Sequence, residues 1–143
     1  MSSVKVFLIS WIAGMAVLPG SIYGQDAQLV AGAKKEGGKV VVYGSIENDT
    51  MDLIAAALKK KTGLEIEFWR SSSTKVMDRV LNEMRTGKPL YDVVLTNSAP
   101  MEFMFNEGAL VKYDSPEAKS FPKEVIHPNL GPQYRNSVIG IVY

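Results

Sequence analysis

Short hydroxyl and amide side chains follow three apolar runs of the sequence, at the points where each run gives way to a helical pattern. With their immediate neighbours they are Gly44, Ser45, Ile46, Ser72, Ser73, Thr74, Thr96, Asn97 and Ser98. Such side chains, together with the N–H groups that the first turn of a helix leaves unbonded, donate hydrogen bonds to anions. Because the carboxyl ends of parallel strands meet at one edge of a sheet, we expect these residues to form one ligand-binding site.

The same residue types are also the usual N-caps of helices. A Ser, Thr or Asn at each junction would be explained equally well by capping of the helix that follows, without any ligand. The recurrence of the pattern at three junctions favours a shared site over three independent caps.

Three strand-and-helix units must position these residues. An apolar run from Lys39 ends at Gly44, and the helix opened by Asn48 or Asp49 carries a buried stripe that ends before the C-cap Gly63. The stripe is Met51, Ile54, Ala55 and Leu58. A short helix at Gln28–Glu36, closed by Gly37-Gly38, precedes this unit.

The second and third units repeat the pattern. Leu64–Arg70 alternates apolar and polar residues, which predicts a strand near the sheet edge, and a helix follows over Thr74–Thr86. Tyr91–Leu95 is predicted to be a strand, and its continuous apolar run Val93–Leu95 predicts a central position covered on both faces. Prolines punctuate the chain after Gly108, and Ser137–Tyr143 predicts a last strand. Successive units of this kind predict an α/β fold with a parallel sheet.

The N-terminal segment has the features of an export signal. Lys5 precedes a 13-residue apolar run, Val6–Leu18, which is too short to span a bilayer, and Gly24 is the expected residue before the cut. We therefore expect a signal peptide at 1–24 and one solute-binding lobe at 25–143, with a signal anchor as the alternative. The chain contains no Cys, so we expect neither disulfides nor a lipid-anchored N-terminal Cys.

Charge excludes one class of partner. Removal of the expected signal peptide takes away one charged residue, Lys5. The 16 basic residues then become 15, which equals the number of acidic residues. Nucleic-acid binding depends on a basic surface excess that such a chain lacks.

Three runs carry a resemblance to a known family. Ala33–Tyr43, Lys61–Ile66 and Pro89–Val94, in this order and spacing, resemble the periplasmic solute-binding proteins of ABC importers, and are most similar to the ferric-ion binding branch. The resemblance runs from about Val30 to Tyr143 and implies the N-terminal lobe of a two-lobed type II binding protein. It also implies a monomer in the periplasm that captures a small molecule or ion and delivers it to a membrane permease.

Two departures from the pattern of the ferric-ion binding relatives weaken the prediction that this chain binds iron. The relatives have a His four residues after the Tyr that ends the first strand, whereas this chain has Glu47 at that position. They have a Glu directly after the Thr that ends the third strand, whereas this chain has Asn97. A carboxylate at Glu47 could ligate a hard cation, although an acidic residue before a helix is more often a partner of the helix dipole. We expect a small anion such as a carboxylate or phosphonate, with ferric ion as the alternative, and no cofactor.

Other residues give little support to catalysis. His127 precedes Pro128 in an irregular stretch, and we expect it to be a surface loop residue without a neighbouring carboxylate. Trp69 and Arg70 could line an anion site, or they could simply pack on an edge strand with the Arg70 side chain in solvent. A small exported hydrolase would need a nucleophile and base for which no motif is present, and a dinucleotide enzyme would need glycines that the first junction lacks. We therefore expect a binding protein and not an enzyme; a lobe that serves a sensory receptor remains the alternative to a transporter subunit.

Overall fold

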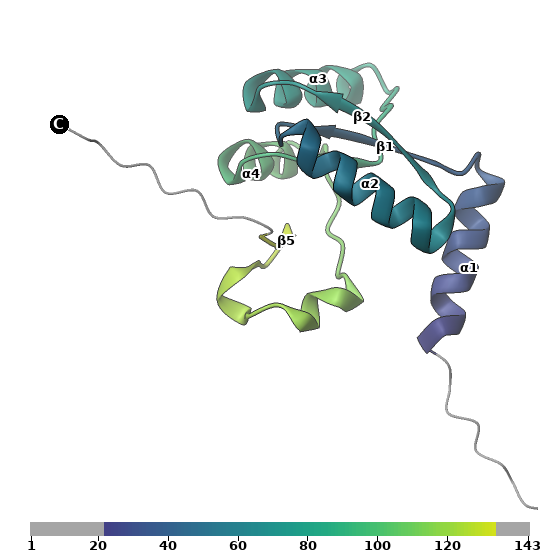
Figure 1. The fold of residues 1–143 in the computed structure, drawn as a ribbon. Helices are drawn as coiled ribbons and strands as arrows, with labels where there is room; N and C mark the ends of the chain where they lie inside the picture. The colour runs from purple at the N-terminus through teal and green to yellow at the C-terminus, as the bar shows by residue number, and fades with distance from the viewer. Residues whose placement is uncertain (1–21, 134–143) are drawn as a thin grey trace, which may run out of the picture.

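The computed structural model describes residues 22–133, so the expected strand Ser137–Tyr143 and most of the expected signal segment lie outside the described residues. Figure 1 shows the arrangement of the elements. In chain order they are α1 (Ile22–Lys35), β1 (Lys39–Gly44), α2 (Asn48–Thr62), β2 (Glu65–Arg70), α3 (Ser73–Arg85), β3 (Val93–Leu95), α4 (Ser98–Asn106), the 3-10 turns η1 (Pro116–Ser120) and η2 (Lys123–Val125), β4 (Ile126–His127) and β5 (Gly131–Pro132).

The main sheet is parallel, as the alternation of strands and helices predicts. Its strand order is β2-β1-β3. Gly44, at the end of β1, is level with Arg70 on one side and Leu95 on the other. The carboxyl ends of all three strands therefore lie at the same edge of the sheet.

The position of β3 differs from the expectation of a central strand. Among the described strands β3 lies at an edge, and Val93 is 41% exposed while Val94 is buried. The central strand is β1, which holds the buried Val42 and Tyr43. A continuous apolar run shows that a strand is largely buried, but it does not say which strands flank it. The edge position expected for β2 is confirmed.

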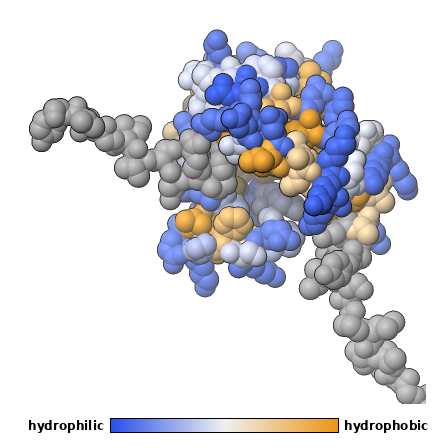
Figure 2. Space-filling view, in the orientation of Figure 1, coloured by the Kyte–Doolittle hydropathy of each residue, from blue (hydrophilic) through white to orange (hydrophobic). Residues whose placement is uncertain are grey.

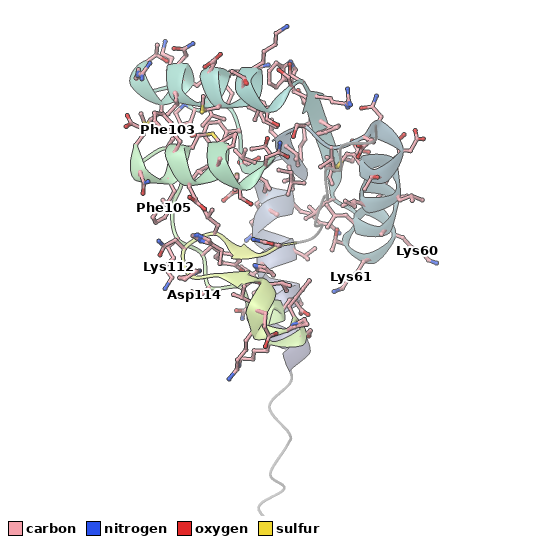
Figure 3. All side chains as sticks on the ribbon, turned by 90° about the vertical axis from the view of Figure 1, so that its left-hand side faces the viewer. Lys60, Lys61, Phe103, Phe105, Lys112 and Asp114 are labelled. Carbon is pink, nitrogen blue, oxygen red and sulfur yellow. The ribbon has the colours of Figure 1, made fainter. Side chains whose placement is uncertain are left out.

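Helices cover the two faces of the sheet unequally. On one face Tyr43 and Val94 pack with residues of α3 and α4, including Val76, Val80 and Met104. On the other face Val42 packs with Ile46 and with Met51 of α2. Figure 3 shows α2 on one side of the strands and the pair α3 and α4 on the other.

The apolar stripe predicted for α2 is only partly buried. Met51 is 2% exposed, but Ile54 is 42% and Leu53 75% exposed. The prediction that Ile54 is buried is therefore wrong: in α2 the buried residue is Met51, which packs with Val42 and Ile46. Within the described residues, none of the helices has the length and apolar character needed to span a bilayer.

Helix ends follow the signals in the sequence with one exception. Gly63 ends α2 in the left-handed conformation, with φ 76°, and its N–H donates to the Lys59 carbonyl. Gly38 closes α1 in the same way, donating to the Ala33 carbonyl. The exception is the start of α1, which lies at Ile22 and not at Gln28.

A partly buried carboxylate joins α3 to the sheet. Glu83 accepts hydrogen bonds from Arg79 Nε (2.8 Å), Tyr43 Oη (2.9 Å) and the N–H of Leu90 (3.0 Å). Burial by itself would raise the pKa of the Glu83 carboxyl, but the hydrogen bonds from Arg79, Leu90 and Tyr43 outweigh it, and the pKa lies below its usual value. The Arg79 guanidinium also lies 4.3 Å from the Tyr43 ring centre.

The segment after α4 returns to the carboxyl edge of the sheet. Tyr91 Oη donates to the Ala109 carbonyl (2.8 Å), which fixes the chain as it leaves α4. The chain then passes through η1 and η2 and forms the short antiparallel pair β4 and β5. Figure 1 shows this segment, in yellow-green, below α4.

Candidate functional site

Three hydroxyl groups from the three strand ends form a continuous chain of hydrogen bonds. Ser73 Oγ donates to Ser45 Oγ (3.2 Å), and Ser45 Oγ shares a hydrogen with Thr96 Oγ1 (2.9 Å). Ser45 follows β1, Ser73 begins α3 after β2, and Thr96 follows β3. The expected convergence of the three junctions is therefore present at the level of side-chain atoms.

Among residues 22–133, one donor of the hydroxyl chain has no acceptor. Three hydroxyl protons supply its two hydrogen bonds, so one O–H, on Ser45 or on Thr96, is left to donate elsewhere. Both residues are only partly exposed. A preorganised O–H at a sheet edge is suited to an oxygen acceptor of a ligand.

The start of α4 adds a second group of donors beside Thr96. Asn97 is the N-cap, with extended backbone, yet its side chain makes no capping hydrogen bond. Met101 is bonded to the Asn97 carbonyl, so the N–H groups of Ser98 and Ala99 precede the first intrahelical bond. The N-terminal end of a helix carries partial positive charge, which favours an anion here.

These groups border a cavity of about 390 Å³. Five of the nine residues predicted from the sequence line it: Ser45, Ile46, Thr96, Asn97 and Ser98. Val94, Leu95 and Met101 supply apolar wall. In the space-filling view of Figure 2 this face of the molecule is hollowed between the α/β layers and the segment that carries β4 and β5.

The opposite wall is a feature that the sequence patterns did not indicate. It consists of His127, Leu130, Gly131, Pro132 and Gln133, from the β4–β5 hairpin. A signal was present in the turn residues of the His127–Pro132 stretch, since Gly131 adopts φ 78°. That signal predicts a turn but does not say against which surface the turn lies.

His127 lies in β4 and not in an irregular loop, and the expectation that it has no neighbouring carboxylate is wrong. His127 lines the cavity, and its Nε2 lies 3.6 Å from Oε1 of Glu102 on α4, so a carboxylate is close by. Its Nδ1 accepts from the backbone N–H groups of Asn129 (3.2 Å) and Leu130 (3.3 Å). The contact with Glu102 is a tertiary one, so it was hidden from a search of sequence neighbours.

The remaining predicted residues lie outside the cavity lining. Gly44 packs against β3, where a Cβ atom would lie 2.8 Å from the Leu95 carbonyl oxygen. Ser72 is the N-cap of α3 and accepts from the Lys75 N–H (3.4 Å). Thr74 is exposed on the first turn of α3, and Ser73 meets the site through Ser45. For Ser72 the capping interpretation thus has direct support.

The first junction is braced by backbone and guanidinium contacts. The Ser45 N–H donates to the Leu95 carbonyl (2.9 Å), so this N–H is occupied within the protein. Arg70 Nε donates to the Ile46 carbonyl (2.8 Å), which explains Arg70 without a ligand. Trp69 packs edge-on against Tyr43, with ring centres 5.2 Å apart.

Glu47, the candidate metal ligand, is the exposed N-cap residue of α2 and does not line the cavity. No cluster of three or more His, Cys, Asp or Glu side chains that could hold a metal ion occurs among residues 22–133. His127 is the one ionisable side chain that lines the cavity in the described part of the chain.

Comparison with known proteins identifies the fold. No family model and no curated protein matches the chain. Among solved structures it is similar to iron-bound HitA from Pseudomonas aeruginosa, with a TM-score of 0.54 and 21% identity over 64% of this chain and 30% of that one. It is equally similar to Trichodesmium IdiA (FutA) in complex with iron and citrate ligands, with a TM-score of 0.54 and 21% identity over 64% of this chain and 29% of that one.

The described residues share the parallel-sheet α/β fold of part of these two structures. The matched part spans less than a third of the length of either structure. At this identity the similarity establishes the fold alone.

Proposed function

We propose that this chain is a lobe of an exported solute-binding protein, which captures a small anion at the carboxyl edge of its sheet. The observation that carries the proposal is the hydroxyl chain Ser73–Ser45–Thr96, which joins all three strand ends and leaves one O–H to donate beside the cavity. The crevice at the carboxyl ends of the strands is where open α/β sheets bind ligands.

The chemistry of the cavity suits an oxygen-rich anion. Its polar lining consists of hydroxyl, amide and imidazole groups, with no acidic side chain among the described lining residues. The α4 N-terminus contributes partial positive charge. A carboxylate or phosphonate would accept hydrogen bonds from these donors at little electrostatic cost.

Ferric ion is the second candidate for the solute. It is favoured by the two structural neighbours, one iron-bound and the other in complex with iron and citrate ligands. The position of Glu47 outside the cavity and the absence of a metal-ligand cluster in residues 22–133 favour the anion. Iron would require ligands from another part of the protein or from an accompanying anion.

The biological role that we propose is delivery of the solute to the membrane permease of an ABC importer. The protein would act in the periplasm as a monomer, after removal of the signal segment and without a lipid anchor. Delivery of the loaded protein to a sensory receptor is the alternative, because the same binding fold serves either partner.

The proposal is tested by titrating the chain with citrate, inorganic phosphate, methylphosphonate and ferric citrate, each followed by calorimetry and by amide NMR shifts. We expect binding of at least one anion, with shifts at Ser45, Thr96 and Asn97. Shifts confined to other surfaces, or no binding of any of the four, would refute this site. Co-purification with a permease from the native host, or with a receptor, separates transport from sensing.

A further inference from the structure

The ring orientation of His127 is fixed by the hairpin that carries it. Nδ1 accepts two backbone N–H groups, those of Asn129 at 3.2 Å and Leu130 at 3.3 Å. Because Nδ1 is an acceptor, the neutral imidazole carries its hydrogen on Nε2. The turn therefore selects one tautomer and one orientation of the ring.

The Nε2 donor is not satisfied by the neighbouring carboxylate. Glu102 Oε1 lies 3.6 Å from Nε2, which is longer than a hydrogen bond between these atoms. Glu102 is half exposed and belongs to α4, while His127 is less exposed and lines the cavity. The negative charge of Glu102 is near enough to favour a hydrogen on Nε2 of His127 and to polarise this N–H bond.

The place of His127 completes the set of donors around the cavity. Ser45 and Thr96 lie on the sheet side and Asn97 on the helix side, whereas His127 lies on the hairpin that forms the opposite wall. We propose that His127 is a ligand-contacting residue, whose Nε2–H donates to an oxygen of the bound anion from the hairpin side. This inference rests on the proposed function, and it assigns to the hairpin a direct part in recognition.

Two substitutions separate the two nitrogens of the imidazole. In His127→Asn, the Oδ1 atom can accept the turn N–H groups in place of Nδ1, and an Asn before Pro128 favours a turn, but nothing replaces Nε2–H. In His127→Gln, the side-chain amide reaches toward the Nε2 position and can donate, while the short acceptor in the turn is lost. A ligand-contacting role predicts that Asn is the worse replacement for binding, and a purely structural role predicts that Gln is the worse one.

Glu102→Gln is the matched control for the contact between His127 and Glu102. If the contact itself held the cavity open, Glu102→Gln and His127→Asn would weaken binding alike. If His127 contacts the anion, Glu102→Gln removes a negative charge near the ligand, and affinity should stay the same or rise.

The experiment uses the full chain and citrate and inorganic phosphate as probes. His127 is the single His of the sequence, so imidazole ¹⁵N NMR reports on it without assignment. We expect the Nε2–H tautomer in the free protein, a shift of the Nε2 resonance on addition of the anion that binds, and affinity lowered about tenfold or more in His127→Asn.

Two outcomes would overturn the proposal, and they are distinguishable. If the unaltered chain binds neither these anions nor the other probes, the proposed function fails and this inference with it. If the unaltered chain binds citrate or phosphate, but the Nε2 resonance stays in place and His127→Asn binds equally well, the inference alone fails and the site on the sheet side stands.

Discussion

Ser45 links the three strand ends, because its hydroxyl oxygen is shared by Ser73 and Thr96. Serine hydroxyl groups thus have different tasks at the strand ends: Ser72 caps α3, Ser73 supports Ser45, and Ser45 faces the cavity. Residue type alone did not separate these tasks, since each is compatible with a Ser that precedes a helix.

We expect Ser45→Ala to weaken binding of the anion identified by titration by about 1 to 3 kcal/mol, because it removes a hydrogen-bond partner and breaks the hydroxyl chain. Ser72→Ala is the control: it removes a cap outside the cavity and should lower the free energy of unfolding by about 1 kcal/mol while affinity is unchanged. Calorimetric titration and thermal unfolding of both variants check this. Equal affinity in all three proteins would show that Ser45 is structural.

Gly44 has a role that follows from its lack of a side chain. An added Cβ would lie 2.8 Å from the Leu95 carbonyl oxygen and 3.0 Å from a ring atom of Phe68. Gly44→Ala should therefore lower the free energy of unfolding by about 1 to 3 kcal/mol. In the control Gly32→Ala, in α1, the new methyl group meets no atom within 4 Å, and stability should be unchanged or higher. Urea unfolding of both variants distinguishes a packing constraint at Gly44 from a general effect of Gly replacement.

At the scale of elements, helices and strands are joined by a few specific contacts. Glu83 ties α3 to β1 through Tyr43 and to the loop before β3 through Leu90. At the start of β3, Asp92 Oδ2 accepts the Val41 N–H (2.8 Å), while its own N–H donates to the Val41 carbonyl (2.9 Å). These contacts fix the position of β3, and therefore of Thr96, relative to β1.

Acid should loosen the attachment of α3. Because the pKa of Glu83 is lower in the folded protein than its ordinary value, its contribution to stability is present above about pH 4.3 and is lost as pH falls through the folded pKa. Glu83→Gln should lower the free energy of unfolding by about 1 to 3 kcal/mol at pH 7 and flatten this part of the pH profile. Asp78→Asn, at an exposed position of the same helix, is the control. A profile identical in the Glu83 variant and the unaltered protein would contradict the assignment.

At the scale of the molecule, the cavity lies between the α/β layers and the returning hairpin (Figure 2). The chain corresponds to less than a third of the structures that share its fold. In a two-lobed binding protein, closure of a second lobe would exclude water from such a cavity and add contacts to the solute.

The export predicted from the N-terminal segment is tested on the whole chain. Expressed in a Gram-negative host, the protein should be cut after Gly24 and released by osmotic shock, since a short apolar run precedes Pro19-Gly20. Intact mass measurement of the released protein locates the cut, which would leave α1 starting at Gln25. Uncut protein in the membrane fraction would instead support a signal anchor.

The sequence by itself determined the three strand-and-helix units, the parallel sheet and the caps at Gly38 and Gly63, because each depends on periodicity and turn chemistry within about twenty residues. It also placed Ser45, Thr96 and Asn97 at strand ends. The tertiary structure alone decided that β3 lies at an edge among the described strands, that Ile54 is exposed, and that the His127 hairpin closes over the cavity beside Glu102. These features depend on which distant segments pack together, and that choice is made by the burial and hydrogen bonding of the whole chain, which no local pattern records.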